Sequence, residues 1–595
     1  MSAPRYQKFS QQSSRSSYNS NYPSPRFSSN FKSSSDDIRA VVAIDFGTTF
    51  SGFAHANKIS PNDIEINTRW SGREGLPKTN TALLYDSSFK EVLKWGEPAL
   101  LYEQKKSRNS SKELQYYKIE RFKLYLDDSN SEKPWLPETL DYRKAITDYL
   151  KKLKGVIEET LDKRWPGLRM SQVLFILCVP AEWGPHTKAI MRDCAYKAEL
   201  LDASLYSHLE FTTEPEAAAL HCLDVIKEHR LGDDDTFLVV DCGGGTVDLT
   251  MRTIIQKGNR LKEETERTGD LCGSTFVDQE FIDFMGRVVG FTALQKFRTY
   301  AHGDLQRLVH RFFCLTVKLP FTGDIENFES IELDLERECP SLIQYITGSE
   351  RTYLEENEWM IELDFESVKE MFDPTIDKII KLINNQLLDL PNRRKCKAMF
   401  LVGGFSESPY LIKRVREKFQ GRVPTIAFPR QPIAAVVKGA VKYGLNMGAV
   451  ESRVLKWTYG VEIKVNFDIR NDPIRLRTND NSIWKFDTLA RRGTQVNVNE
   501  TFQKEYVPIN ADQKLAIFRV FITKERNPTY IKENGMNGMK VLGTLRVNLS
   551  KMPYRGRDRP VEFSLTFGTM EIKATAKNKL TNEEYHVKFD YEKKK

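Results

Sequence analysis

Two similar stretches, "VVAIDFGTTF" and "FLVVDCGGGTVDL", constrain the fold of this chain more than any other feature. In each, an apolar strand ends in Asp, one further residue, Gly and then Thr. The matching residues are Asp45, Gly47 and Thr49 in the first stretch and Asp241, Gly243 and Thr246 in the second. One such turn alone is typical of an ordinary hairpin, whereas a repeated one indicates an internal duplication. The sequence therefore predicts two related lobes, each presenting one turn.

The residue types in these turns suit a phosphate ligand. Glycine lets backbone N–H groups converge into an anion-binding nest, and threonine hydroxyls add donors. A carboxylate beside the nest would repel phosphate unless it holds a hydrated Mg²⁺, which Asp45 and Asp241 could share through its waters. A third turn, "FLVGGFSES", adds Gly403 and Gly404. The set predicts a magnesium nucleotide clamped between two lobes, and the absence of any Gly-Lys pair excludes an ordinary P-loop.

The order of predicted elements indicates an α/β fold from residue 38 onward. "AITDYLKKLKGVIEETL" and "EPEAAALHCLDVI" predict helices, "SQVLFILCVP" predicts a buried strand, and residues 434–445 predict a closing helix. Past about residue 448 the apolar residues alternate with a period of two, as in "VEFSLTF", which is typical of half-buried antiparallel strands. We therefore expect a two-lobed α/β unit followed by a small β-sandwich.

Four regions follow from these patterns. Residues 1–38 form a Ser-rich tail that cannot bury enough apolar surface to fold, so we expect it to be disordered. Lobe I is expected over residues 39–231 and lobe II over residues 232–447. An all-β unit is expected over residues 448–595.

Composition limits which cellular compartments and which classes of partner we expect for this chain. The net charge of +8 over 595 residues is small and dispersed, so we expect no nucleic-acid partner. Eight cysteines are scattered singly, several in apolar runs, which is typical of a reduced intracellular protein without disulfides or zinc. No apolar run is long enough to span a membrane, and the N-terminus lacks a signal core. We expect a cytoplasmic protein, with the basic tail leaving a nuclear location open.

The three turns, in their order and spacing, resemble the ATPase domain of the seventy-kilodalton heat-shock chaperones, which has the actin-like fold with ribonuclease H-like lobes. "AIDFGTTFSG", "VVDCGGGTVDLT", "TEPEAAAL" and "LVGGFSESPYL" carry the resemblance, which is strong over residues 39–446. "TGDLCGSTFVDQEF" resembles the divergent branch of heat shock 70 kDa protein 12-like members. The C-terminal strands are more weakly similar to the peptide-binding β-sandwich of these chaperones, but no length remains for a helical lid.

The resemblance implies roles for individual residues. Asp45 and Asp241 would hold hydrated magnesium, while Glu214 and Asp248 would orient the attacking water. A lysine would contact the γ-phosphate; Lys123 is the candidate, and Arg121 competes with it. The phosphates would lie on Gly47, Thr48, Thr49, Gly243, Gly244, Gly245 and Thr246. The base and ribose would lie near Gly273, Lys318, Gly403, Gly404 and Ser406.

The chain also departs from the family pattern. An acid is expected where Ser274 stands, and charged partners are expected where Leu315 and Leu319 flank Lys318. Each lost charged hydrogen bond is worth roughly 1.5–3 kcal/mol, which puts nucleobase affinity in question. "NMGAVESRVLKW" replaces the acidic, Leu-rich linker that couples the two domains in the family.

Three functions fit these observations. The first is a chaperone-like protein that binds ATP or ADP with Mg²⁺, hydrolyses ATP slowly to ADP and phosphate, and thereby regulates its protein partners. Those partners would be client proteins, extended peptides bound by the β-unit, and a nucleotide-exchange or co-chaperone factor. The second is a nucleotide-sensing scaffold that binds ATP or ADP without significant turnover. The third is a small-molecule kinase, which the C-terminal β-unit disfavours.

Overall fold

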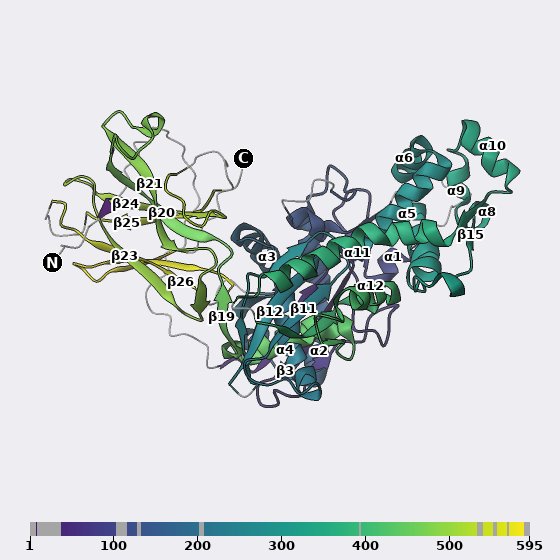
Figure 1. Cartoon of the computed structure of the whole chain (residues 1–595), viewed down its shortest axis with the longest axis horizontal. Helices are drawn as coiled ribbons and strands as arrows, with labels where there is room; N and C mark the ends of the chain where they lie inside the picture. Colours follow the sequence, from purple (N-terminus) through teal and green to yellow (C-terminus); the bar gives the residue numbers. More distant parts are fainter. Residues whose placement is uncertain are drawn as a thin grey trace.

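The computed structural model places two α/β lobes side by side and a β-unit at one end of them (Figure 1). We keep lobe I, lobe II and β-unit as names for residues 39–231, 232–447 and 448–595. The structure describes residues 37–102, 116–127, 133–201, 208–256, 258–391, 394–531, 539–550, 556–567 and 570–587, together with Gln7 and Lys8. The predicted disordered tail therefore lies almost entirely outside the described residues.

Lobe I is built on a six-stranded sheet in the order β10-β9-β2-β3-β4, with β5 pairing β3. The strands are β2 (Ala40–Phe46), β3 (Phe50–Asn57), β4 (Glu65–Ile66), β5 (Thr79–Asn80), β9 (Val173–Val179) and β10 (Leu209–Thr213). Its main helices are α2 (Tyr142–Arg164), α3 (Pro185–Lys197) and α4 (Glu214–Glu228). A smaller sheet carries β6 (Ala82–Tyr85), β7 (Val92–Trp95) and β8 (Tyr117–Glu120), next to α1 (Glu97–Leu100). The predicted helices and the buried strand of this lobe are confirmed.

Lobe II repeats the central topology of lobe I. In both lobes a first strand pairs antiparallel with the next strand and parallel with a later one: β2 with β3 and β9, and β11 with β12 and β17. Its sheet contains β11 (Thr236–Cys242), β12 (Val247–Ile255), β13 (Arg260–Glu263), β14 (Thr268–Asp270), β17 (Cys396–Val402) and β18 (Thr425–Ala427). The internal duplication inferred from the two turns is therefore visible in the strand order.

Helices α4 and α13 (Ala435–Leu445) pack together between the two sheets. Gly439 permits this close crossing, because a Cβ atom there would lie 1.7 Å from the carbonyl oxygen of Ala217. The alanine-rich run of α4 is buried in the same core, which contains apolar residues of both sheets. The lobes thus share a small-residue helix pair that packs between their sheets.

The far end of lobe II is mostly helical (Figure 1). It contains α5 (Ser274–Val289), α6 (Phe291–Tyr300), α7 (His302–Arg307), the π-helix η5 (Leu308–Lys318), α8 (Leu335–Glu338), α9 (Pro340–Ile343) and α10 (Gly348–Glu356). A two-stranded sheet of β15 (Ile331–Asp334) and β16 (Met360–Leu363) completes it. Helices α11 (Phe365–Leu388) and α12 (Pro409–Phe419) connect this end to the sheet of lobe II.

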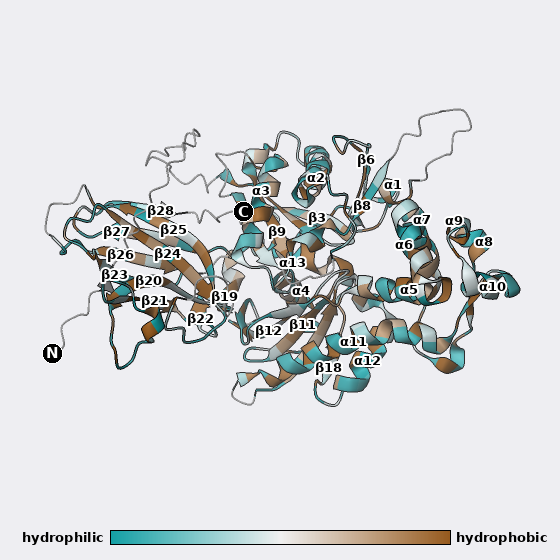
Figure 2. Cartoon of the chain, turned by 90° about the horizontal axis from the view of Figure 1, so that it is seen from above, coloured by the Kyte–Doolittle hydropathy of each residue, from teal (hydrophilic) through white to brown (hydrophobic). Residues whose placement is uncertain are grey.

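The β-unit consists mainly of two sheets that share one apolar core. One sheet contains β20 (Thr458–Asn466), β21 (Ser482–Ala490), β24 (Leu515–Thr523) and β25 (Lys540–Asn548). The other contains β23 (Thr501–Val507), β26 (Val561–Thr566), β27 (Lys573–Asn578) and β28 (Glu584–Val587), with the backbone of β1 (Gln7–Lys8) beside β23. Brown apolar segments line the space between these sheets in Figure 2.

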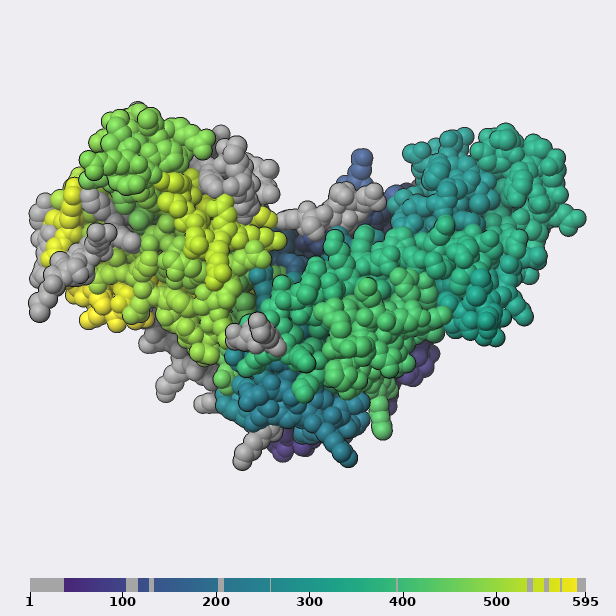
Figure 3. All heavy atoms as spheres, viewed as in Figure 1, coloured from purple at the N-terminus to yellow at the C-terminus, as the bar shows by residue number. Residues whose placement is uncertain are grey.

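Two strands past residue 448 belong to the sheet of lobe II. Strand β19 (Val450–Val454) pairs parallel with β13, and β22 (Gln495–Asn497) pairs with β19. The chain therefore enters the β-unit through a strand that extends the lobe II sheet. On the face shown in Figure 3, a broad hollow separates the β-unit from the helical end of lobe II.

The described residues contain no helix that is both long and apolar enough to cross a membrane. All eight cysteines lie in the described part of the chain and are free thiols, seven of them buried.

Candidate functional site

The two predicted phosphate turns face each other across the lobes. A Cβ atom on Gly244 would lie 2.3 Å from Thr49 Oγ1, and one on Gly245 would lie 2.5 Å from Thr48 Oγ1. Any side chain at these two glycines would therefore collide with the first turn. The first turn is braced by Thr81, whose hydroxyl donates to the carbonyl oxygen of Gly47 at 2.9 Å.

The second turn is held against the start of α5. Gly243 N donates to the carbonyl oxygen of Thr246 at 3.0 Å, which closes the turn. Ser274 N donates to Gly243 at 3.0 Å, and Gly273 N donates to Gly245 at 3.2 Å, each to the carbonyl oxygen. A Cβ atom on Gly273 would lie 2.4 Å from the carbonyl oxygen of Gly244. Gly273 is thus placed beside the second turn because only glycine fits there.

The third turn reaches the same place from β17. Gly403 has a φ of +83°, and a Cβ atom on it would lie 2.5 Å from Asp241 Oδ1. Gly404 follows at the start of a short 3-10 helix, Gly404–Glu407. Ser406 is fully buried and donates its hydroxyl to the carbonyl oxygen of Val402, so it braces the turn from within.

Four buried carboxylates lie at the meeting point of the turns, and two buried lysines accompany them. Lys78 Nζ donates to Asp45 Oδ2 at 2.5 Å, and Lys123 Nζ donates to Glu214 Oε1 at 2.7 Å. The four acids are Asp45, Glu214, Asp241 and Asp248. With every group ionised, the carboxylates outnumber the ammonium groups by two. The cluster therefore has the charge that a divalent cation would balance.

The pKa values of the acids show the same excess of negative charge. Burial and the neighbouring carboxylates Glu214 and Asp45 hold the pKa of Asp241 well above its usual range. Burial and Glu214 raise the pKa of Asp248 to about 7, against the opposing effect of the Ala181 N–H. Burial also raises the pKa of Glu214, although Lys123 opposes it. Buried carboxylates that repel one another are a feature of functional sites.

Lys78 joins this cluster although sequence analysis did not single it out. It lies directly before β5, and the pairing of β5 with β3 brings its ammonium group next to the Asp45 carboxylate. Burial opposes its charged form, but Asp45 raises the pKa of the Lys78 ammonium beyond that effect. A lone lysine in "LPKTNT" carries no motif that could have identified it.

The structure separates the two candidates for the lysine role. Lys123 lies in the 3-10 helix Phe122–Leu126 and is buried against Glu214, with its ammonium 5.4 Å from the ring centre of Trp183. Arg121 has a left-handed φ of 58° and pairs instead with Asp278 of lobe II at 3.3 Å. Lys123 therefore belongs to the carboxylate cluster, and Arg121 belongs to a neighbouring ion pair between the lobes.

One oxygen of Asp248 is fixed by the protein backbone. Ala181 N donates to Asp248 Oδ1 at 2.7 Å. Oδ2 of Asp248 is buried and has no hydrogen-bond partner among the described residues. This oxygen is available to a water molecule or a ligand.

The predicted base and ribose region is less polar than the phosphate region. Lys318 is buried and donates to both Asp278 Oδ1 and the carbonyl oxygen of Ser274, at 2.6 Å each. Leu315 and Leu319 on either side of it are 60% and 58% exposed. The Lys318 ammonium thus donates its hydrogen bonds to groups of the protein itself, and the exposed side chains beside it are aliphatic.

No group of three or more His, Cys, Asp or Glu side chains is arranged to hold a metal ion directly anywhere in the described ranges. The sequence predicted a magnesium ion held by Asp45 and Asp241 through water, so direct ligation was not expected. That magnesium site stays a prediction.

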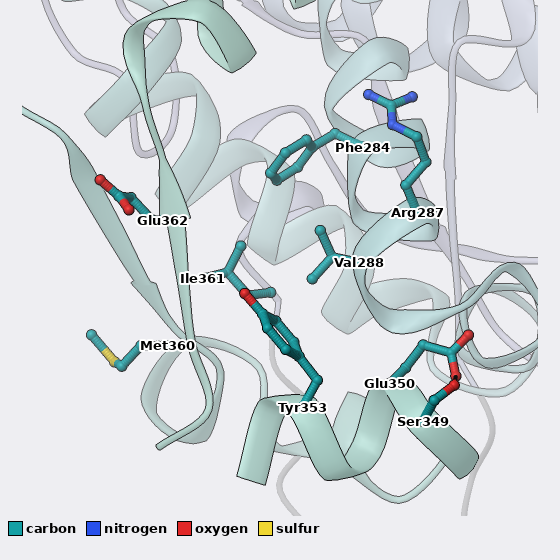
Figure 4. Close-up of a pocket in the computed structure, with 9 residues that line it drawn as sticks. All are labelled: Phe284, Arg287, Val288, Ser349, Glu350, Tyr353, Met360, Ile361 and Glu362. Atoms are coloured by element: carbon teal, nitrogen blue, oxygen red, sulfur yellow. Dashed lines mark hydrogen bonds between the residues drawn. The ribbon is translucent and has the colours of Figure 1, made fainter. Parts of the chain in front are cut away.

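Two cavities lie away from the predicted phosphate turns. One, of about 750 Å³, lies between the lobes beside Trp135, His302 and Gln306. The other, of about 550 Å³, lies at the helical end of lobe II, where Tyr353 of α10 approaches Ile361 of β16 and Val288 of α5 (Figure 4). None of the predicted site residues lines either cavity.

The chain is similar in sequence to several known proteins. A family model described as a domain of unknown function (DUF8340) matches residues 231–427. Heat shock 70 kDa protein 12A of Mus musculus is 27% identical, covering 93% of this chain and 91% of its own length. Heat shock 70 kDa protein 12B of Homo sapiens is 26% identical with the same coverage. Chaperone protein DnaK of Thermosipho melanesiensis is 25% identical over 80% of this chain and 72% of its own.

Proposed function

Because this chain is a distant member of the heat shock 70 family, we propose that it binds ATP between its lobes and hydrolyses it slowly. We further propose that the bound nucleotide regulates contact with protein partners. Membership of this family implies nucleotide binding. The observation that carries the proposal is the meeting of the two glycine–threonine turns beside four buried carboxylates and two lysines.

The residues present fit a magnesium nucleotide. Gly244 and Gly245 leave backbone N–H groups without side chains in front of Thr48 and Thr49, which suits phosphate oxygens. The raised pKa values of Asp241 and Asp248 indicate carboxylates that lack enough positive charge around them. Bound magnesium would supply charge neutralisation for the phosphates, and the buried carboxylates Asp45 and Asp241 would hold its water shell.

The chain's own groups then have distinct tasks in hydrolysis. Asp248, with one oxygen fixed by the Ala181 N–H and the other unpartnered among the described residues, is suited to accept a proton from the attacking water. Glu214, held by Lys123, orients that water. The Thr48 and Thr49 hydroxyls and the glycine N–H groups donate hydrogen bonds to the phosphate oxygens. They stabilise the negative charge that develops on these oxygens in the transition state.

The β-unit is the proposed site for partners. The name of the DnaK relative describes a chaperone, and two sheets over one core offer strand edges to an extended peptide. A nucleotide-exchange or co-chaperone factor is part of the same proposal, as is a cytoplasmic location. Strand β19 joins the β-unit directly to the lobe II sheet, which provides a physical route from nucleotide to partner.

The test combines calorimetry of Mg-ATP and Mg-ADP binding with single-turnover hydrolysis. The variants are Asp241→Asn, Lys123→Ala and Glu214→Gln, with Asp480→Asn on the exposed surface of the β-unit as the matched control. Magnesium-dependent binding with turnover that Lys123→Ala removes supports the proposal. Binding without turnover in the parent protein would instead favour the nucleotide-sensing scaffold. Absence of binding would overturn both.

A further inference from the structure

A small cavity of about 60 Å³ lies where lobe I, lobe II and the β-unit meet. Figure 1 shows this junction, with α3, β12 and β19 next to the β-unit. The side chains around the cavity include four cations and no carboxylate, the remaining members being mostly apolar and aromatic. The cations are Lys188 of lobe I, Arg267 of lobe II, and Arg453 and Lys456 at the entry to the β-unit.

Arg267 is only partly satisfied by the protein. Its side chain is buried, with the residue 9% exposed. Nη1 lies 3.3 Å from Glu263 Oε2, and Nη2 contacts the sulfur of Met570 at 4.0 Å. Nε is buried and has no hydrogen-bond partner among the described residues. A guanidinium presents donors that match an oxyanion, so an unused buried N–H beside a cavity indicates a ligand.

Lys188 is the second incompletely compensated cation, and the charge of Glu571 acts on it without a salt bridge. The residue is 6% exposed, and its ammonium donates to the carbonyl oxygen of Met570 at 3.1 Å. No carboxylate of the described ranges forms a salt bridge with it. Burial and the positive charge of Arg267 lower the pKa of Lys188 to about 7. The cavity thus brings two poorly compensated cations together.

The other two cations are already paired. Arg453 donates to both carboxylate oxygens of Glu216, at 2.9 and 2.8 Å. Lys456 Nζ lies 2.6 Å from Glu182 Oε1. Lys188 therefore carries the least compensated positive charge. Arg267 is the next, because it shares Glu263 with Arg252. They come from one lobe each, and both touch Met570 of the β-unit.

We propose that this cavity is a binding site for a small inorganic oxyanion of phosphate or sulfate type, held by Lys188 and Arg267 at the junction of the three units. A buried water needs on the order of 15 Å³, so the cavity accommodates an ion of a few atoms but not a nucleotide. The same chemistry could come from a phosphoryl group on a larger molecule. The small volume of about 60 Å³ favours the free ion. Because the ligands come from both lobes and contact Met570, the ion would strengthen attachment of the β-unit.

The test uses full-length, nucleotide-free protein titrated with sulfate or phosphate, with chloride balancing the ionic strength. Unfolding temperature and the fluorescence of Trp457, which lines the cavity, report binding. Subtracting the signal of Trp457→Phe isolates this tryptophan from the others. Specific binding gives a saturable rise at low millimolar concentration, whereas general salting effects continue without saturation. We expect saturation in both signals.

Lys188→Met and Arg267→Gln should each lower the affinity for the ion, measured from the Trp457 titration, roughly ten- to hundredfold. Each substitution removes a charge-assisted hydrogen bond to the ion. Lys188→Met removes a single carbonyl contact, so it keeps the test valid if Arg267→Gln fails to fold. Exposed Lys381→Met and Arg475→Gln are the matched controls and should respond like the parent. A Trp457 response that is absent from the parent, or unchanged in Lys188→Met, would overturn the proposal.

A third arm identifies the source of the ion. Phenyl phosphate carries the same charged group on a body too large for the cavity. We expect it to leave Trp457 unchanged. If it binds as tightly as phosphate, the site accepts phosphoryl groups of larger molecules, and the assignment to a free inorganic ion is wrong.

Discussion

Lys123 Nζ donates to Glu214 Oε1 at 2.7 Å, which joins a short 3-10 helix of lobe I to the first residue of α4. Both side chains are buried, so each charge depends on the other for compensation. The pair lies beside the facing phosphate turns, where Glu214 also interacts with Asp45, Asp241 and Asp248. Changes to this pair should therefore affect hydrolysis before they affect nucleotide binding.

We expect Lys123→Ala to lower the single-turnover hydrolysis rate by roughly 10²–10³-fold, the usual effect of removing one preorganised donor. Affinity for Mg-ADP should change far less than the rate. Lys144→Ala removes a half-exposed lysine paired with Asp148 and serves as the control. Equal losses in ADP affinity and in rate would show that Lys123 acts in binding and not in turnover.

Gly244→Ala should disrupt the contact between the two turns. The added methyl group would lie 2.3 Å from Thr49 Oγ1, so the turns must separate. We expect a loss of about 1–3 kcal/mol in the free energy of unfolding, measured by urea titration, together with weaker Mg-ATP binding. Gly421→Ala adds a methyl group with nothing within 4 Å and should change neither quantity. Unchanged nucleotide binding in Gly244→Ala would place the nucleotide elsewhere.

Asp248 should make the nucleotide-free protein less stable as the pH rises. Burial and Glu214 raise its pKa to about 7 from the usual 3.8, so between these values the folded state binds more protons than the unfolded state. The free energy of unfolding then decreases with rising pH in this window, at up to about 1.4 kcal/mol per pH unit. Asp248→Asn should flatten this dependence in urea titrations from pH 4 to pH 8. A steeper dependence in the variant would contradict the assignment.

The buried pair of Arg453 and Glu216 should be essential for joining β19 to the lobes. Arg453 is 5% exposed and Glu216 is fully buried. Arg453→Met leaves Glu216 buried without its main cation, which should lower the free energy of unfolding by about 3–5 kcal/mol. The double variant Arg453→Met with Glu216→Gln should recover part of this loss. Thermal and urea unfolding of all four proteins complete the cycle, and additive losses would show that the two residues are not coupled.

The predicted turns illustrate what local sequence can reveal. Asp45 and Gly47 are near neighbours in one strand–turn unit, and Asp241 and Gly243 repeat the pattern. The duplicated glycine turn could therefore be predicted from the sequence alone. The alternation in "VEFSLTF" likewise predicted β26, which pairs antiparallel with β23 and β27. These features depend on residues that are close in the chain.

Other site features depend on segments that meet only in the folded chain. Lys78 reaches Asp45 because β5 pairs with β3, and no motif marks that lysine. The choice between Lys123 and Arg121 was open in the sequence. In the structure Arg121 pairs with Asp278, whereas Lys123 pairs with Glu214, and the role of a lysine at the γ-phosphate stays a prediction.

By itself, then, the sequence determined the duplicated turns, the α/β order of the lobes and the alternating strands of the C-terminal part. These depend on side-chain periodicity and on glycines within a few residues of an acid. Only the tertiary structure decided which lysine meets which carboxylate, that β19 extends the lobe II sheet, and that Lys188 and Arg267 share a cavity. Charge balance in a buried site depends on distances through space, and residues far apart in the chain contribute to it.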